Sequence, residues 1–508
     1  MFLAAATGSW AIPHNDAWAY ALIARHYAEQ GSIELAGWNR SALIGQIVVL
    51  GHLGSSLIVQ KVFVAVLAAL GLLATYGLLE PRVGGNRALL GTALVGLMPA
   101  FGLLATSYMA DVPAFTAVIG GLFLTDQALR TESTRWLLGA LAVATWGVTV
   151  REQALVGLVV IVIITVTSWH GRKRQIALLG GLMSILAITG FELWRRSLPH
   201  DSGAPLASTG ISLALALPIA ICTCLTVALF VFPAVLVTAR PRSWSRRTQL
   251  TSVSTLVLTV LIVIAAVLFR MGSHIFLPCY LAPGGAYSAS SIGTRTALPG
   301  WWWFALVAMA CMSLALIVGH YIDAGAPLDR MSGLVLILIA AGTLGEIVLG
   351  QAPYARFFLV LIPFACVALL GTREANNRLM PRWYNWLLSL TALAALAATT
   401  TLITANALAF DAARWKAASS LVARGVAPTD IDAGIEWVGY HASEPASLSS
   451  AHTQALGWYM RMFEHSRECY VVSASPLQGM TSIATTQYRT YALAGSSKLW
   501  TYRVSPCR

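Results

Sequence analysis

The sequence predicts an all-α polytopic transmembrane bundle of about 12–13 helices with a small α/β segment at its C-terminal end. Of its 508 residues, 57% are hydrophobic and only 11% are charged, whereas soluble proteins carry about 25% charged residues. The mean hydropathy is +0.70. Apolar runs of roughly 18 residues or more recur, and each can cross a hydrocarbon core of about 30 Å. The alternation of a transmembrane β-barrel, in segments of about ten residues, is missing.

The basic residues indicate which links between helices face the cytoplasm. The formal net charge of +12 would suggest nucleic-acid binding in a soluble protein. Here the basic residues cluster in short links at 172–174, 240–247 and 373–382, and such clusters mark the cytoplasmic side. We therefore expect the lipid bilayer as a partner, and no nucleic acid.

Alternation across the membrane then places twelve helices. They are expected near 57–79, 88–106, 112–129, 136–150, 154–169, 176–194, 212–238, 251–269, 299–318, 332–350, 356–371 and 385–404. The start, MFLAAATGSWAIP, is too short to span, although the first helix must enter from outside. An earlier crossing is thus expected, and the start is either truncated or mis-assigned.

Two domains are predicted. Residues 1–404 form the transmembrane module, in which the first outside loop, 10–56, carries interfacial helices. Residues 405–508 form an extracytoplasmic α/β segment, because DAARWKAASSLVARG has helical periodicity and CYVVSAS and KLWTYRVS resemble strands. Cys469 and Cys507 lie in this segment and could pair outside the cytoplasm.

Two carboxylates at outside helix ends are the candidate catalytic groups. Asp16, flanked by Asn15 and Tyr20, is placed to accept a proton from a polar acceptor at the membrane surface. Asp111, in the short turn MADVPAF, is costly so close to hydrocarbon. For both residues, helix capping is the alternative.

Cations in the outside loops predict an anionic partner. Arg151 and Arg356 each lie near an outside helix end, Tyr354 precedes Arg356, and Arg295 lies in a long outside loop. Glu152 could instead neutralise Arg151 as a buried pair. His14, Asp16 and His26 match no recurrent metal-site spacing, and no phosphate-binding glycine motif follows a strand. No metal ligand and no firm cofactor are predicted, although a divalent metal is possible.

The chain resembles the GT-C superfamily of polytopic glycosyltransferases, which includes protein mannosyltransferases and aminoarabinose transferases. The resemblance rests on the order and sidedness of HNDAWAYALIARHYAEQGSIELAGW, YMADVPAF, VREQALVGL and YARFFLVLIPF. It implies transfer of a sugar from a polyprenyl-phosphate-linked donor, a co-substrate, with Asp16 as base and Asp111 as the second-loop acid. Relatives often carry two adjacent acidic residues where this chain has Asn15-Asp16, which leaves Glu29 or Glu34 as a weak substitute.

These observations predict a multi-pass cell-membrane enzyme that inverts the sugar in a single displacement on the extracytoplasmic face. The acceptor is expected to be a glycan, a lipid or a protein. The predicted substrate-binding residues are Asn15, Tyr20, Glu34, Arg151, Arg295, Tyr354 and Arg356. The main alternative is a secondary transporter or flippase of a polar or lipid-linked solute. A non-catalytic scaffold would leave the outside carboxylates and arginines unexplained.

Overall fold

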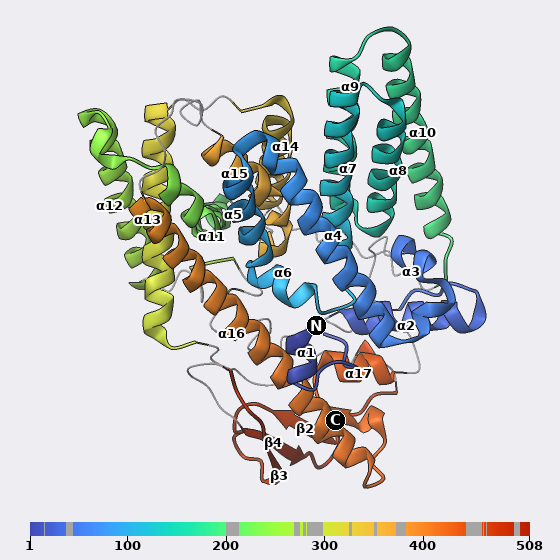
Figure 1. Ribbon diagram of the computed structural model, residues 1–508. Coiled ribbons are helices and arrows are strands. Elements are labelled where there is room, and N and C mark those ends of the chain that lie inside the picture. The colour runs from blue at the N-terminus through green and yellow to red at the C-terminus, as the bar shows by residue number, and fades with distance from the viewer. Residues whose placement is uncertain are drawn as a thin grey trace.

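The fold is a bundle of long helices with a small mixed segment at one end (Figure 1). The computed structural model describes residues 1–14, 16–36, 44–199, 213–268, 275–277, 281, 298–324, 328–349, 353–371, 383–442, 460, 462–463, 465–491 and 498–507. Within these ranges, eight helices are long and apolar enough to cross a membrane. They are α4 (Leu57–Val83), α7 (Asp111–Thr131), α10 (Gly171–Arg195), α11 (Leu213–Thr238), α12 (Arg246–Leu268), α13 (Gly300–Ala324), α14 (Arg330–Val348) and α16 (Trp383–Val422).

Shorter helices occupy the other four predicted positions. They are α5 (Gly85–Gly96), α8 (Thr134–Val150), α9 (Leu155–Ser168) and α15 (Leu361–Leu370). The predicted helix at 88–106 is interrupted, because α5 ends before Pro99 and a separate helix, α6 (Pro99–Leu104), starts there. A proline has no N–H for the preceding turn but fits the first turn of a new helix. The helical bundle that the sequence predicts is confirmed.

Helix α7 lies at the centre of its half of the bundle. In its most apolar stretch 72% of the residues are buried, against 11% in α12. It packs against α4, α8 and α9. A Cβ on Gly147 of α8 would lie 2.6 Å from the Ala117 side chain of α7, so the missing side chain lets these two helices approach closely. This core fixes the position of Asp111, the first residue of α7.

The first-loop helices and the C-terminal segment lie at the same end of the bundle (Figure 1). The loop forms α2 (Ala17–Gln30), α3 (Ile44–Leu50) and the 3-10 helix η1 (Gly51–Ser55), preceded by α1 (Phe2–Ala6). Helix α17 (Ile435–His441) of the C-terminal segment contacts α2. Helix α16 is continuous over 40 residues, so it passes through the predicted boundary at 404–405 and joins the two parts without a linker.

The C-terminal segment carries a four-stranded sheet in the order β1-β2-β4-β3. Its strands are β1 (Ile431–Asp432), β2 (Tyr470–Ser473), β3 (Ser482–Gln487) and β4 (Lys498–Arg503). Strands β1 and β2 are parallel, and β4 pairs antiparallel with both β2 and β3. Cys469 and Cys507 form a disulfide. Both predicted strands, in CYVVSAS and KLWTYRVS, are present as β2 and β4.

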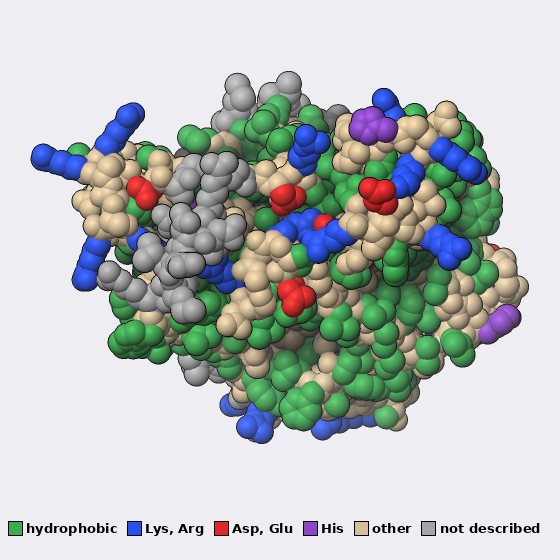
Figure 2. Space-filling view, turned by 45° about the horizontal axis from the view of Figure 1, so that its top comes forward, with side chains coloured by type: hydrophobic (Ala, Val, Ile, Leu, Met, Phe, Trp, Pro, Cys, Tyr) green, Lys and Arg blue, Asp and Glu red, His purple; other side chains and the backbone are tan. Residues whose placement is uncertain are grey.

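The opposite end of the bundle carries short links and ion pairs. Turned toward the viewer in Figure 2, it shows many Lys and Arg side chains, whereas the flank below is largely hydrophobic. Asp126 accepts a hydrogen bond from Arg82 at 2.8 Å and forms an ion pair with Arg130 at 2.8 Å, and Glu132 pairs with Lys173 at 2.7 Å. The predicted cytoplasmic links near Arg82, Glu132 and Lys173 therefore lie at the end away from the sheet, whereas the predicted link at 373–382 lies outside the described residues.

Candidate active site

Asp111 lies at the meeting point of three elements. One oxygen, Oδ1, is 2.8 Å from an Arg151 guanidinium nitrogen and 3.4 Å from Nε of Arg356. Arg151 follows α8, and Arg356 lies in the 3-10 helix η4 (Ala355–Leu359). The Asp111 side chain is 3% exposed, and its Oδ2 has no hydrogen-bond partner among the described residues. Two cations thus share one buried carboxylate, whose second oxygen can still accept a hydrogen bond.

This trio borders a cavity of about 130 Å³. The walls are mainly apolar and come from α7, α9, α14 and η4, with Glu346 of α14 as a fourth titratable group. The guanidinium of Arg151 lies 5.4 Å from the Phe357 ring centre, and that of Arg356 lies 4.7 Å from the Tyr354 ring centre. The attraction between a guanidinium and an aromatic ring restrains the arginine side chain. The N–H groups at the edge of the guanidinium can still donate hydrogen bonds.

The structure pairs Arg151 differently from one sequence interpretation. Glu152 is exposed, and Arg151 contacts Asp111 together with Gln153, to which its Nε donates at 3.1 Å. The idea of a buried Arg151–Glu152 pair is therefore wrong. The reason is geometric: the chain is extended at Arg151, which turns consecutive side chains to opposite sides.

Asp16 occupies the N-cap position of α2, half-buried, without a side-chain capping hydrogen bond. Asp111, in contrast, is the first residue of α7 and follows the N-cap residue Ala110. Ser107 donates a hydrogen bond of 3.2 Å to the His14 carbonyl, which holds the start of the first loop against the turn that leads to Asp111. Capping hydrogen bonds therefore explain neither carboxylate.

The remaining predicted site residues are dispersed. Tyr20 is buried in α2, and Glu34 is half-exposed with an oxygen 3.6 Å from Nε2 of His26. Tyr354 is 40% exposed beside Arg356. Asn15 and Arg295 lie outside the described residues. The structure thus brings together Asp111, Arg151, Arg356 and Tyr354, and leaves the roles assigned to Tyr20 and Glu34 as predictions.

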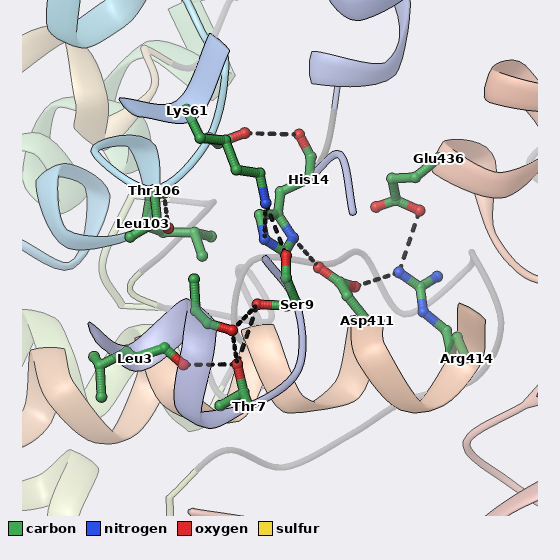
Figure 3. Close-up of polar contacts among 12 residues, drawn as sticks. Leu3, Thr7, Ser9, His14, Lys61, Leu103, Thr106, Asp411, Arg414 and Glu436 are labelled. Atoms are coloured by element: carbon green, nitrogen blue, oxygen red, sulfur yellow. Dashed lines mark hydrogen bonds and ion pairs between the residues drawn. The ribbon is translucent and has the colours of Figure 1, made fainter. Parts of the chain in front are cut away.

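A buried polar network near Asp16 was not predicted from the sequence. It joins His14, Lys61, Asp411, Arg414 and Glu436, whose side chains are at most 1% exposed (Figure 3). Asp411 accepts from Nδ1 of His14 and, at 2.5 Å, from Arg414, which also contacts Glu436 at 3.2 Å. Lys61 donates to the Ser9 carbonyl at 2.8 Å and lies 3.5 Å from Nε2 of His14.

Burial decides the charges on this network. Desolvation lowers the pKa of His14 below its usual 6.5, and the neighbouring Lys61 lowers it further. A neutral His14 can donate from Nδ1 to Asp411 and accept from Lys61 at Nε2, so its two neighbours fix its tautomer. Desolvation also raises the pKa of Glu436 to about 7, against the opposing effect of Arg414. The signal in the sequence was Lys61, a lysine inside an apolar run.

No metal centre is evident in the part of the chain that the structure describes. There, no three His, Cys, Asp or Glu side chains lie close enough together to hold an ion. His14 is engaged by Asp411 instead.

Comparison with known proteins finds a resemblance to one family over part of the chain. Residues 47–194 match the family model described as dolichyl-phosphate-mannose-protein mannosyltransferase. The match covers less than a third of the chain, so it shows a resemblance of this segment to that family. The segment runs from α3 to α10 and includes Lys61, Asp111 and Arg151. The match agrees with the predicted resemblance to multi-pass membrane glycosyltransferases of the GT-C type.

Solved structures give a weaker likeness. ArnT from Cupriavidus metallidurans bound to undecaprenyl phosphate is 12% identical, with a TM-score of 0.47, and the match covers 99% of this chain and 98% of ArnT. ArnT from Cupriavidus metallidurans in the apo state is 16% identical, with a TM-score of 0.38, over 99% and 97% of the two chains. A search of curated proteins found no match.

Proposed function

We propose that this enzyme transfers a sugar from a polyprenyl-phosphate-linked donor to a glycan, lipid or protein acceptor on the extracytoplasmic face. The observation that carries the proposal is the pair of guanidinium groups, Arg151 and Arg356, that share Asp111 at the wall of a largely apolar cavity. A lipid phosphate needs this combination, because its head is anionic and its chain is apolar.

The two arginines bind the donor phosphate and stabilise it as a leaving group. A guanidinium fork matches phosphate oxygens in two parallel hydrogen bonds. Asp111 holds both forks before the donor arrives and limits the repulsion between them. Charge that develops on the phosphate oxygens in the transition state then meets cations that are already oriented, which lowers the barrier.

Asp16 is the general base. It takes the proton from the acceptor hydroxyl while that oxygen bonds to the anomeric carbon. The bond from this carbon to the phosphate oxygen breaks, and its electron pair leaves with the phosphate. One displacement inverts the anomeric centre. Asp16 is half-buried at the start of α2, so the residue remains partly accessible to an acceptor.

The sidedness of the site is part of the proposal. The Cys469–Cys507 disulfide lies in the segment that shares an end with α2, and disulfides persist in oxidising compartments. The basic links at the opposite end favour a cytoplasmic location for that end. Both features support an active site and a C-terminal segment outside the cytoplasm.

The test is Asp16→Asn in purified enzyme, supplied with a panel of undecaprenyl-phosphate-linked hexoses and pentoses. We expect transfer to fall at least about 100-fold, in line with the loss of a general base, with unchanged thermal stability. Asp430→Asn is the matched control, because that carboxylate forms an ion pair with the exposed Arg467. Undiminished transfer by Asp16→Asn would remove it from this role. Solute flux without any change in lipid-linked sugars would favour a transporter.

A further inference from the structure

The first loop is held on both sides of Asp16 by the C-terminal segment. Two residues before it, His14 is fully buried and bonded through Nδ1 to Asp411. Asp411 lies in the part of α16 that extends beyond the predicted boundary of the transmembrane module. Arg414, one turn further along, bonds the same carboxylate and reaches Glu436 of α17 (Figure 3).

Two residues after Asp16, the Trp18 ring is 1% exposed and is covered by the same segment. A Cβ added to Gly439 of α17 would lie 2.4 Å from the Trp18 ring, so α17 rests directly on that ring. The Phe463 ring meets Trp18 edge-on at 5.7 Å between ring centres. Further along α2, the Arg25 guanidinium lies 5.4 Å from the Tyr440 ring centre.

We propose that the C-terminal segment positions Asp16, through the His14–Asp411 hydrogen bond on one side and the Trp18–Gly439 contact on the other. This inference rests on the proposed role of Asp16 as base. His14, Asp411 and Gly439 are positioning residues, since they act through the backbone of the loop. The segment is accordingly required for the transfer step itself, whichever acceptor the enzyme uses.

The two contacts are suited to this task because both resist displacement. If His14 moves away from Asp411, a buried carboxylate loses a hydrogen bond in a site that water does not reach. If Trp18 moves, a large buried ring leaves a void under α17. Asp16 lies midway along the chain between these two anchors, so its backbone is confined to a narrow range of positions. A general base needs such confinement, because a displacement of about 1 Å can reduce the rate about 100-fold.

The proposal is tested with Asp411→Asn and Gly439→Ala. Each is expected to lower kcat for sugar transfer about 10- to 100-fold, while KM for the undecaprenyl-phosphate-linked sugar that the wild type uses best changes less than about twofold. Backbone amides of residues 16–20 should exchange faster with deuterium in both variants. Asp430→Asn and Gly190→Ala are matched controls, since a Cβ at Gly190 meets nothing within 4 Å. Both controls should retain wild-type kcat and exchange.

A second measurement separates positioning from general loss of structure. In an Asp16→Asn background, Asp411→Asn should lower the remaining rate no further, because the two residues act through one group. An equal loss in both backgrounds would overturn the inference, as would wild-type kcat in Asp411→Asn and Gly439→Ala. Undiminished transfer by Asp16→Asn alone would instead overturn the proposed function, so the two failures are distinguishable.

Discussion

At the scale of single residues, burial gives the charged groups of this enzyme their character. Asp111 is stabilised by two arginines at the edge of a cavity. Glu436 is held next to Arg414 in a site without water access, and there the loss of hydration outweighs the attraction. The first arrangement places a carboxylate between two guanidinium groups beside a cavity. The second makes a carboxylate sensitive to pH near neutrality.

The pH dependence of stability should reveal Glu436. Its pKa is raised from 4.5 to about 7 in the folded protein, mainly by desolvation. Between these values the folded state binds more protons than the unfolded state, so the contribution of Glu436 to stability falls as pH rises through this window. Glu436→Gln removes that contribution. The melting temperature of Glu436→Gln relative to wild type should therefore increase from pH 5 to pH 7.5.

Glu132→Gln is the control for this experiment. A hydrogen bond from Lys173 lowers the pKa of Glu132, so its contribution is already complete above pH 4.5 and should stay constant from pH 5 to pH 7.5. A difference between Glu436→Gln and wild type that shrinks with pH would mean that Arg414 outweighs desolvation.

At the scale of elements, the hydrophobic pattern of the sequence was sufficient to predict the helices but insufficient to predict the contacts between them. Each of the twelve predicted spans corresponds to a helix. A helix that crosses a bilayer needs a long run of apolar residues, and such a run can be recognised from the local sequence alone. The break at Pro99 is a local rule that the predicted span 88–106 overlooked.

The site was only partly predictable for the same reason. Arg151 and Arg356 stood out as cations at helix ends, but their common partner Asp111 depends on how three elements meet. His14 and Asp411 are 397 residues apart, and nothing local in DAARWK indicates a partner in the first loop. Helical periodicity in that stretch was visible, whereas the length of α16 as one continuous element was not.

Continuity of α16 can be tested by inserting one alanine between Ala405 and Asn406. The insertion rotates everything beyond it by about 100° and shifts it by about 1.5 Å, which turns Asp411 away from His14. We expect a lower melting temperature and loss of sugar transfer. An alanine inserted after Gly425, beyond the end of α16, should be tolerated because it lies in a turn. Wild-type activity of the first insertion would contradict the role of α16 as a rigid connection.

At the scale of the whole molecule, the two ends of the bundle differ in chemistry. One end has short, arginine-rich links between helices. There, Asp126 forms ion pairs with Arg82 and with Arg130. The other end carries the first loop, the cluster of Asp111, Arg151 and Arg356 beside the cavity, and the C-terminal segment with its sheet and disulfide. Such polarity suits an enzyme whose substrates meet on one face of a membrane.

Labelling of intact cells should show this polarity directly. Gln487→Cys places a thiol on exposed strand β3, and Arg172→Cys places one on the exposed first turn of α10 at the opposite end. A membrane-impermeant maleimide should label Gln487→Cys in intact cells and Arg172→Cys only after permeabilisation, with the wild type as background. The reverse pattern would invert the proposed topology and move the active site to the cytoplasm.

The distance along the chain between His14 and Asp411 also has a consequence for synthesis. At about 5–20 residues per second, the ribosome needs roughly 20–80 seconds to pass from one residue to the other. During that interval Lys61 and His14 are already made, yet the groups that enclose them are still untranslated. Residues 405–508 thus complete a buried polar network whose other members are His14 and Lys61. A chain that terminates before Asp411 would leave His14 and Lys61 without the side chains that enclose them, and these polar groups would be exposed to the quality-control machinery of the membrane.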